Sequence, residues 1–334
     1  MIYRAIGTMS GSSLDGLDIA FAEFQENAGI WSYEIKTADC YSFSADWIEK
    51  LKTATSLNGL AYQLLHIEFG HYIGQQINNF INENNLHYQI ALISSHGHTT
   101  FHVPSKKMTA QLGDGASIAA ETQLPVVTDL RAMDLAFGGE GAPIVPIGEK
   151  LLLGDYNFFL NLGGIANISF KTEPYIAFDI CAANRVLNML ANDIGKEYDD
   201  EGQMARAGNI EVPLLEKLNS LAYYKQPYPK SLANDFGTDV VYPMIRDSKP
   251  AIENGLRTYV EHIVTQIRES IIAATVLDRA NSTSMLVTGG GALNSFLIQR
   301  LSEELNLMKI KVVVPGENLI KYKEAMIMTI NWLQ

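Results

Sequence analysis

The chain has 334 residues, a length typical of two domains on the usual prior of roughly 100–200 residues each. Hydrophobic residues make up 47% and charged residues 19%, so a large folded core is expected and disorder is excluded. The formal net charge of −12 comes without any basic run, which excludes a duplex-binding surface. A phosphate site stays compatible with this balance, because it needs local backbone N–H groups and a cation.

The cysteines and the hydropathy pattern indicate the cellular compartment in which the protein is expected. Cys40 and Cys181 lie far apart and form neither a metal-binding spacing nor a disulfide framework, which fits a reducing compartment. No stretch of about 18 uninterrupted apolar residues occurs, and the first residues predict a strand rather than a secretory signal. We therefore expect a cytoplasmic protein with no membrane partner and no nucleic-acid partner.

The first half of the chain predicts strands that alternate with helices. The expected strands are 2–6, 17–24, 90–93 and 126–128, and the expected helices are 45–85 and 114–122. The first two strands form a hairpin around a polar, glycine-rich turn over 7–16. A second glycine-rich stretch, 137–143, predicts a bend between two lobes.

The second half shows the same pattern of strands and helices, without a repeat in the amino-acid sequence itself. The expected strands are 157–162, 165–170, 175–178, 285–287 and 311–314, and the expected helices are 183–194, 211–220, 251–277, 295–305 and 322–333. Each half opens with a hairpin around a glycine turn. Alternating strands and helices indicate an α/β fold, and the two similar halves indicate a duplicated architecture.

The first glycine-rich turn has the composition of a phosphate-binding loop. Glycines let the backbone approach an anion closely, and successive N–H groups can then hold phosphate oxygens. The candidate nucleotide-binding residues are Gly11, Ser12, Ser13, Leu14, Asp15, Gly16, Leu17 and Asp18. Asp15 and Asp18 are also the candidate Mg²⁺ ligands, because Mg²⁺ usually takes one or two carboxylates and keeps several waters. A plain hairpin turn is the alternative, but it needs only about two to five residues.

Two further glycine turns follow strands in the second half. Their candidate nucleotide-binding residues are Asn161, Gly163, Gly164, Gly289, Gly290 and Gly291. A glycine turn before a helix lets a flat nucleoside lie close to the backbone. Each turn alone is common at a strand end, whereas three in this order indicate a nucleotide site.

Several motifs resemble those of the anhydro-N-acetylmuramic acid kinase family. They are Gly7-Thr8-Met9-Ser10-Gly11-Ser12-Ser13-Leu14-Asp15-Gly16-Leu17-Asp18, Ser95-His96-Gly97-His98-Thr99, Gly138-Gly139-Glu140-Gly141-Ala142-Pro143 within 129–146, Asn161-Leu162-Gly163-Gly164-Ile165-Ala166-Asn167, Phe178-Asp179, Pro229-Lys230-Ser231, Gly289-Gly290-Gly291-Ala292 and Glu324-Ala325. They occur in family order from residue 7 to residue 325, so the resemblance covers nearly the whole chain.

This resemblance implies a two-lobed actin-like ATPase fold of the ribonuclease H-like type, with duplicated mixed β-sheet domains flanked by helices. We expect a first lobe of 1–131 with 322–334 and a second lobe of 132–321, with nucleotide and sugar in the cleft between them. The implied activity uses ATP and Mg²⁺ to open 1,6-anhydro-N-acetylmuramic acid and phosphorylate O6 during cell-wall recycling. The resemblance also implies a homodimer.

Asp179 matches the general base of the family. In that role it would deprotonate the water that attacks the anomeric carbon, while the departing O6 takes the γ-phosphoryl group. A partly buried carboxylate at a strand end can have a pKa raised toward neutrality, which suits this role. From the residues alone, the alternative is an N-cap of the helix expected over 183–194.

Four further residues are candidates for sugar binding. His96 and His98 end an expected strand and can hydrogen-bond sugar hydroxyls or the acetamido group; a zinc pair and a turn histidine are the alternatives. Arg131 and Asp134 follow another expected strand and can clamp the carboxylate of the lactyl group, because Arg suits bidentate carboxylate recognition. A solvated ion pair between them is the alternative.

The chain departs from the family pattern at the expected sugar side. After Asp179 the family usually has Gly-Pro-Gly-Asn, where this chain has Cys181-Ala182-Ala183-Asn184, and His98 and Glu140 replace two glutamines. Two alternatives therefore stay open: a related sugar kinase with a different amino-sugar acceptor, and a nucleotide-binding regulatory protein that has lost turnover. A panel of sugars offered with ATP would separate them.

Overall fold

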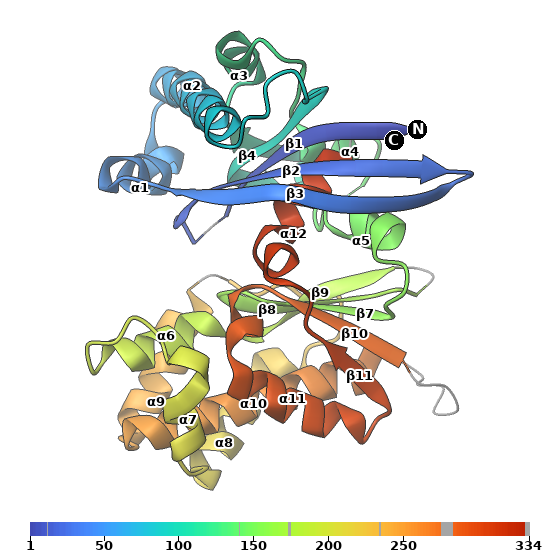
Figure 1. Ribbon diagram of the computed structural model, residues 1–334. Helices are drawn as coiled ribbons and strands as arrows, with labels where there is room; N and C mark the ends of the chain where they lie inside the picture. Colours follow the sequence, from blue (N-terminus) through green and yellow to red (C-terminus); the bar gives the residue numbers. More distant parts are fainter. Residues whose placement is uncertain (12, 140, 173–174, 234, 275–282, 331–334) are drawn as a thin grey trace. The chain divides into compact units, whose positions relative to one another are not determined.

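The computed structural model describes residues 1–11, 13–139, 141–172, 175–233, 235–274 and 283–330. By its internal contacts the chain divides into two compact units, whose elements are labelled in Figure 1. Unit 1 contains Met1–Gly154 and Tyr322–Gln334, and unit 2 contains Asp155–Lys321.

Unit 1 is built on a mixed sheet. Its strands are β1 (Ile2–Ser10), β2 (Gly16–Asn27), β3 (Ile30–Ser42), β4 (Leu92–Val103), β5 (Met108–Leu112) and β6 (Val126–Val127). The order is β3-β2-β1-β4-β5, and β6 also pairs with β4. The first three strands form an antiparallel meander, whereas β1 with β4 and β4 with β6 are parallel. Parallel neighbours need a crossover, which the helices between β3 and β4 provide.

Unit 1 also contains helical segments that differ in length and in burial. They are α1 (Ala45–Thr53), η1 (Ala54–Ser56), α2 (Gly59–Glu83), η2 (Pro104–Lys106), α3 (Gly115–Thr122), α4 (Leu130–Ala136), α5 (Pro146–Leu152) and α12 (Glu317–Ile330), of which the last extends from unit 2 into unit 1. Phe69, Ile73 and Ile77 of α2 recur at helical spacing and are fully buried. Leu64 lies outside this buried face and is 59% exposed, whereas its neighbour Leu65 is buried.

Unit 2 repeats the topology of unit 1. Its strands are β7 (Phe158–Leu162), β8 (Ile165–Phe170), β9 (Ile176–Ala182), β10 (Thr283–Thr288) and β11 (Ile310–Val313), in the order β11-β10-β7-β8-β9. Again the first three strands form an antiparallel meander, and the remaining two pair in parallel beside the first. The duplicated mixed sheets expected from the sequence are confirmed.

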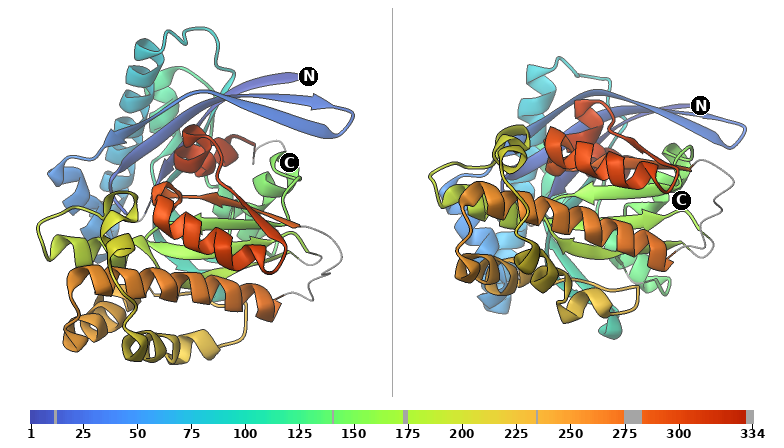
Figure 2. Two further views of the ribbon diagram at one scale, coloured as in Figure 1. Left: turned by 60° about the horizontal axis from the view of Figure 1, so that its bottom comes forward. Right: turned by 90° about the horizontal axis from the view of Figure 1, so that it is seen from below.

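Helices cover the sheet of unit 2. They are α6 (Asn184–Asn192), η3 (Asp200–Gly202), α7 (Gln203–Ala207), α8 (Val212–Asn219), η4 (Ala222–Lys225), the π-helix η5 (Phe236–Val241), α9 (Tyr242–Ser248), α10 (Ile252–Ala274), η6 (Gly290–Leu293) and α11 (Ser295–Asn306). Figure 2 shows α10 and α11 lying side by side along the sheet. No helix in the described part of the chain is both long and apolar enough to span a bilayer.

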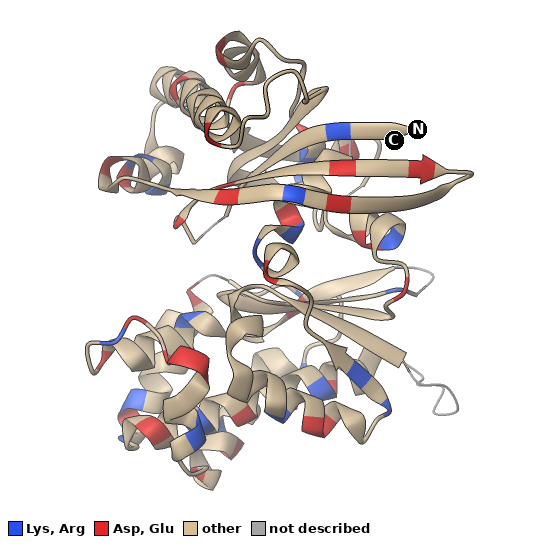
Figure 3. Cartoon of the chain, in the orientation of Figure 1, with Lys and Arg blue, Asp and Glu red and all other residues tan. Residues whose placement is uncertain are grey.

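Charged residues gather on the helices of unit 2 rather than on its sheet (Figure 3). Asp179 is the only charged residue within strands β7, β8, β9 and β10, all of which the structure describes in full. A buried carboxylate within these four strands costs free energy unless it is hydrogen-bonded.

The contacts place residues 132–154 in unit 1, whereas we expected them in the second lobe. The reason is local packing, because α4 lies against β5 and α5 lies against β3. The glycine-rich stretch near Gly141 is tied back to α4, since the Gly141 N–H donates to Asp134 Oδ2 at 2.7 Å. This stretch is therefore part of unit 1 rather than a bend between lobes.

Candidate active site

The first glycine-rich turn is shorter than expected. β1 continues to Ser10 and β2 begins at Gly16, so residues 11–15 form the connection. A connection of this length is an ordinary hairpin, so loop length alone does not indicate a ligand. Ser12 lies outside the described residues. Leu17 is fully buried in the core, which leaves only its backbone for a ligand.

The polar side chains at the end of β1 already have partners in β4. Thr8 Oγ1 donates to Ser95 Oγ at 2.9 Å, and Ser10 Oγ lies 3.0 Å from His98 Nδ1. All four side chains are buried. They join the two parallel strands beneath the hairpin tip rather than facing solvent.

Three carboxylates gather near the tip of this hairpin in unit 1. Asp15 accepts hydrogen bonds from Ser13 Oγ at 2.7 Å and from the Gly16 N–H at 3.1 Å. Asp18 pairs in register with Cys40 on β3 and accepts a hydrogen bond from its thiol. Burial, opposed by that hydrogen bond and assisted by the charges of Asp15 and Glu324, raises the pKa of Asp18 to about 7.

This donor set fits Mg²⁺. Carboxylate oxygens are the ligands that this hard cation prefers, and it needs only one or two of them beside waters and phosphate oxygens. A nearby cation would also offset the burial and, to a smaller extent, the carboxylate repulsion that raise the pKa of Asp18. No group of three His, Cys, Asp or Glu side chains suited to a metal ion occurs among the described residues, so an all-protein cage is not formed there.

His96 and His98 lie within β4 rather than at its end, so that expectation is wrong. The strand continues because β5 pairs with its second half and Gly97 adopts a left-handed φ of 70° at the irregular point. A side chain on Gly97 would come within 2.2 Å of the Leu112 carbonyl, so only glycine fits there. Burial lowers the pKa of each histidine to about 4, so both are neutral at pH 7.

Arg131 fixes the tautomer of His96. Arg131 Nε donates to His96 Nε2 at 2.7 Å, so that ring nitrogen must be the acceptor. The proton therefore sits on Nδ1, which donates to the Gly97 carbonyl at 2.9 Å. A guanidinium beside the ring also disfavours a bound cation, which argues against the zinc alternative.

Arg131 and Asp134 are tied to the glycine-rich stretch rather than to each other. Arg131 Nη1 donates to the Gly141 carbonyl at 2.9 Å, and Asp134 accepts from the Gly141 N–H. The alternative of a solvated ion pair between Arg131 and Asp134 is therefore not supported by these described contacts. Burial lowers the pKa of Arg131, and the charge of Glu324 opposes that shift.

The two glycine turns of unit 2 lie next to each other. A side chain on Gly289 would come within 2.4 Å of Asn161 Oδ1, and one on Gly291 would come within 2.7 Å of Leu162 Cβ. The backbone of Gly163 and that of Gly164 accept hydrogen bonds from the first residues around α6, at 3.1 Å and 2.8 Å. The structure therefore gathers all the second-half candidates at the ends of β7 and β10.

Gly163 and Gly164 have no structural need to be glycine. Neither has a positive φ, and a side chain on Gly163 would meet no atom closer than 3.4 Å, or 3.7 Å on Gly164. The protein itself leaves room for a Cβ at this turn. Open space of this kind is what close backbone approach to a phosphate requires.

Asp179 is held at the middle of β9 by a neighbouring segment. Its Oδ2 accepts from the Leu232 N–H at 2.9 Å and from Ser231 Oγ at 3.1 Å. Burial raises its pKa, and these two hydrogen bonds oppose the rise. Its carboxylate does not cap α6, whose N-cap is Ala183 without a side-chain hydrogen bond, so the N-cap alternative is wrong.

One departure from the family pattern, Cys181-Ala182-Ala183, lies in the core of unit 2, whereas another, Glu140, lies outside the described residues. β9 continues through Ala182, and the side chains of Cys181, Ala182 and Ala183 are all buried. A side chain on Gly237 of the π-helix would come within 3.0 Å of Ala182 Cβ. The alanine side chains are therefore packed inside unit 2.

The sequence analysis missed the residues that act on the candidate carboxylates from far along the chain. Ser231 and Leu232 bind Asp179, and Cys40 and Glu324 influence Asp18. Pro229-Lys230-Ser231 and Glu324-Ala325 were noted only as part of the resemblance. Nothing in their local pattern identifies the partner.

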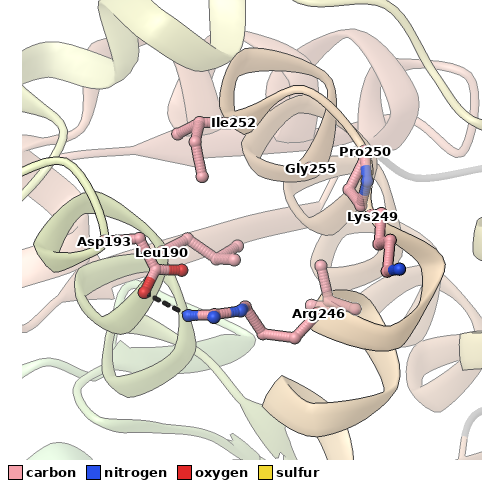
Figure 4. Close-up of a pocket in the computed structure, with 8 residues that line it drawn as sticks. Leu190, Asp193, Arg246, Lys249, Pro250, Ile252 and Gly255 are labelled. Carbon is pink, nitrogen blue, oxygen red and sulfur yellow. Dashed lines mark hydrogen bonds and ion pairs between the residues drawn. The ribbon is translucent and has the colours of Figure 1, made fainter.

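A cavity in unit 2 lies away from all of these residues. It has a volume of about 350 Å³, and its lining residues are Leu190, Asp193, Ile245, Arg246, Lys249, Pro250, Ile252 and Gly255. Asp193 accepts from Arg246 Nη1 at 2.6 Å, as Figure 4 shows. It contains none of the predicted site residues.

Two sheets of matching topology, each with a glycine turn after its first strand, define the class of actin-like ATPase folds. A solved structure of this fold, component A of the (R)-2-hydroxyglutaryl-CoA dehydratase from Acidaminococcus fermentans, aligns with a TM-score of 0.52. The alignment covers 99% of this chain and 97% of the other at 11% identity, so it concerns the fold alone.

Sequence comparison identifies the family. The model of the anhydro-N-acetylmuramic acid kinase family matches residues 3–333. Relatives with that name include one from Aliivibrio fischeri, 34% identical over 90% of this chain and 84% of its own length. Another, from Francisella tularensis subsp. novicida, is 33% identical over 94% of this chain and 87% of its own length. The chain belongs to the anhydro-N-acetylmuramic acid kinase family.

Proposed function

We propose that this protein is an ATP-dependent kinase that opens 1,6-anhydro-N-acetylmuramic acid and phosphorylates its O6, yielding N-acetylmuramic acid 6-phosphate. The observation that carries the proposal is the carboxylate of Asp179. It is the one charged side chain within β7, β8, β9 and β10, its pKa is raised by burial, and one of its oxygens accepts hydrogen bonds from two donors. These are the properties of a general base that works near neutral pH.

The reaction balances with this one base. Asp179 takes a proton from water as the water oxygen bonds to the anomeric carbon C1. The C1–O6 bond breaks, and O6 bonds to the γ-phosphorus as the bond from that phosphorus to the ADP oxygen breaks. Water, ATP and the anhydro sugar thus give the 6-phosphate, ADP and one proton, which Asp179 releases to solvent.

We propose that the nucleotide is bound by the hairpin tip around Gly11 and by the glycine turns at Gly163–Gly164 and Gly289–Gly291. Their N–H groups would bind the phosphates. That both units contact one nucleotide is part of this proposal. Mg²⁺, held by Asp15 and Asp18, would neutralise phosphate charge, since phosphoryl transfer depends mainly on positioning and charge neutralisation.

His96, His98, Arg131 and Asp134 remain our candidates for the sugar side. Two of the five N–H groups of Arg131 donate to His96 and to the Gly141 carbonyl, and the two N–H groups of Nη2 would donate to the sugar carboxylate. His96 and His98 would act as neutral hydrogen-bonding groups, because burial lowers the pKa of both to about 4. We further propose a homodimer in the cytoplasm, where ATP is available; light scattering would check the dimer.

Incubation of the protein with ATP, Mg²⁺ and the anhydro sugar in ¹⁸O-labelled water tests the reaction. We expect a ring-opened 6-phosphate with the label at C1 and none in its phosphate, measured promptly by mass spectrometry. Label in inorganic phosphate without a sugar product would contradict the proposal. Product from another amino sugar alone would favour the different-acceptor alternative, and nucleotide binding without any product would favour the regulatory alternative.

Replacing Gly163 with alanine tests the nucleotide site. The protein has room for this Cβ, so the melting temperature should stay unchanged, while ATP affinity should fall roughly tenfold or more, about 1.4 kcal/mol per decade. Calorimetric titration with ATP and Mg²⁺ measures the affinity. Gly59→Ala is the control, because its Cβ would meet no atom within 4 Å and it lies at the start of α2, away from the proposed nucleotide residues. Equal affinities in both variants would place the phosphates elsewhere.

A further inference from the structure

We propose that Ser231 is a positioning residue which, together with the Leu232 N–H, fixes Oδ2 of Asp179 and leaves Oδ1 as the oxygen that accepts the proton. This inference deepens the proposed function and rests on it. It assigns different tasks to the two oxygens of one carboxylate. It also gives the segment 230–232 a role that its local sequence does not indicate.

The geometry around Asp179 distinguishes its two oxygens. Oδ2 receives both donors, from Ser231 Oγ at 3.1 Å and from the Leu232 N–H at 2.9 Å. No hydrogen bond from the described residues reaches Oδ1. A carboxylate held through one oxygen keeps a fixed orientation, so the lone pairs of the other point in one direction.

Asp179 and segment 230–232 are also joined through their backbones. The Asp179 N–H donates to the Lys230 carbonyl at 3.0 Å. Three hydrogen bonds therefore connect one residue of β9 to three consecutive residues of the segment. Rotation of the carboxylate away from Ser231 would break two of them.

The segment is itself held to η4. Lys230 Nζ donates to the carbonyls of Tyr223 and Tyr224 at 3.3 Å and 3.4 Å and lies 4.7 Å from the Tyr223 ring centroid. Tyr223 in turn donates its hydroxyl to the Asp179 carbonyl at 2.7 Å. Asp179 is therefore connected to Lys230, Lys230 to Tyr223, and Tyr223 back to Asp179.

Tyr224 of η4 is also hydrogen-bonded to a polar cluster that includes the buried His262. The Tyr224 hydroxyl lies 3.0 Å from His262 Nε2, and His262 Nδ1 lies 2.6 Å from Asn219 Oδ1. Burial lowers the pKa of His262 to about 3, so the ring stays neutral and both its hydrogen bonds persist through the physiological range. The hydrogen bonds that His262 makes beneath η4, the element to which Lys230 binds, therefore do not change over this pH range.

Burial raises the pKa of Asp179, and it also shifts the pKa of other ionisable groups in this part of unit 2. Burial raises the pKa of Tyr223 from η4, of Cys181 on β9 itself and of Tyr259 from α10. Lys230 contributes a positive charge from the segment. Removing the Ser231 hydroxyl removes one of the two hydrogen bonds that oppose the burial effect, so the pKa of Asp179 should rise.

The test compares Ser231→Ala, Ser231→Thr and Ser220→Ala. Ser220 is the matched control, because its exposed hydroxyl donates only to the Lys217 carbonyl one turn back. We expect Ser231→Ala to move the acid limb of the kcat profile upward by about 0.5–1 pH unit, from loss of one hydrogen bond to a charged group. Ser231→Thr should restore the wild-type limb, and KM for ATP should not change.

A second measurement separates this inference from the proposed function. ¹³C-labelled aspartate allows the carboxyl signal of Asp179 to be titrated by NMR without any turnover, with Asp179→Asn identifying the signal. A higher pKa in Ser231→Ala than in the wild type supports the inference even if no sugar product forms. An unchanged NMR pKa, or an equal shift in Ser220→Ala, would overturn it.

Discussion

Replacing Asp179 with asparagine is expected to lower kcat by roughly 10²–10⁴-fold, the usual contribution of a general base. The amide has the same shape, and its oxygen can still accept from Ser231 and Leu232. Its nitrogen would then stand in the place of Oδ1, where it cannot take a proton from water. The loss should therefore come from chemistry and not from misfolding.

Steady-state kinetics with the anhydro sugar measure this loss, and ATP titration serves as the control. The affinity for ATP should stay within a factor of about two to three, because the nucleotide residues we propose are separate from Asp179. Retention of at least a tenth of wild-type kcat would show that another group activates the water. Loss of ATP affinity to the same extent would instead place Asp179 in nucleotide binding.

Replacing Glu149 with leucine is expected to destabilise unit 1 by about 3–5 kcal/mol, the usual cost of removing one partner from a buried ion pair. Glu149 of α5 and Lys323 of α12 pair at 2.9 Å, and their side chains are only 2% and 5% exposed. The single change leaves the Lys323 ammonium buried beside an apolar side chain. Changing both residues, Glu149→Leu with Lys323→Met, should recover most of the loss.

Tryptophan fluorescence during urea unfolding measures the free energy of unfolding of unit 1. Two of the three tryptophans of the chain, Trp31 on β3 and Trp47 on α1, lie in unit 1, and Trp332 is outside the described residues. The double variant is the control, because it keeps the volume and removes both charges. A single variant within about 1 kcal/mol of wild type would show that the pair contributes little to stability.

The hydrophobic pattern within each segment was sufficient to predict many of the helices and strands. The periodicities of α2 and α10 and the apolar runs of β7, β8 and β10 are strong because each element buries one face or both faces in its own unit. β3 was missed, although Trp31, Tyr33 and Ile35 alternate with exposed residues. Its charged residues and its place at the sheet edge weaken the apolar signal.

Element ends depended on pairing that the local pattern does not contain. β1 extends through Thr8 and Ser10, which are polar but buried against β4. β4 extends through its histidines because β5 supplies hydrogen bonds. Polar residues that bond one another across strands look like loop residues when each strand is considered alone.

The candidate site was predictable where the type of a residue alone indicates its chemistry, as for a carboxylate or a glycine turn. Asp179 and the glycine turns were found from the sequence, and their roles stay predictions. The environment of Asp179 was not predictable, because Ser231 contacts it from 52 positions away. Glu149 and Lys323 are separated by 174 positions, so no local pattern pairs them.

The matching order of the two sheets makes individual positions comparable between the halves. Counted from each hairpin tip, Asp18 on β2 corresponds to Asn167 on β8, and their register partners across the next strand are Cys40 and Asp179. One half therefore carries its acid on the central strand of the meander, and the other carries it on the outer strand. A repeated scaffold offers each position twice, and here the acid of each half stands where the other half has an uncharged residue, Asn167 opposite Asp18 and Cys40 opposite Asp179.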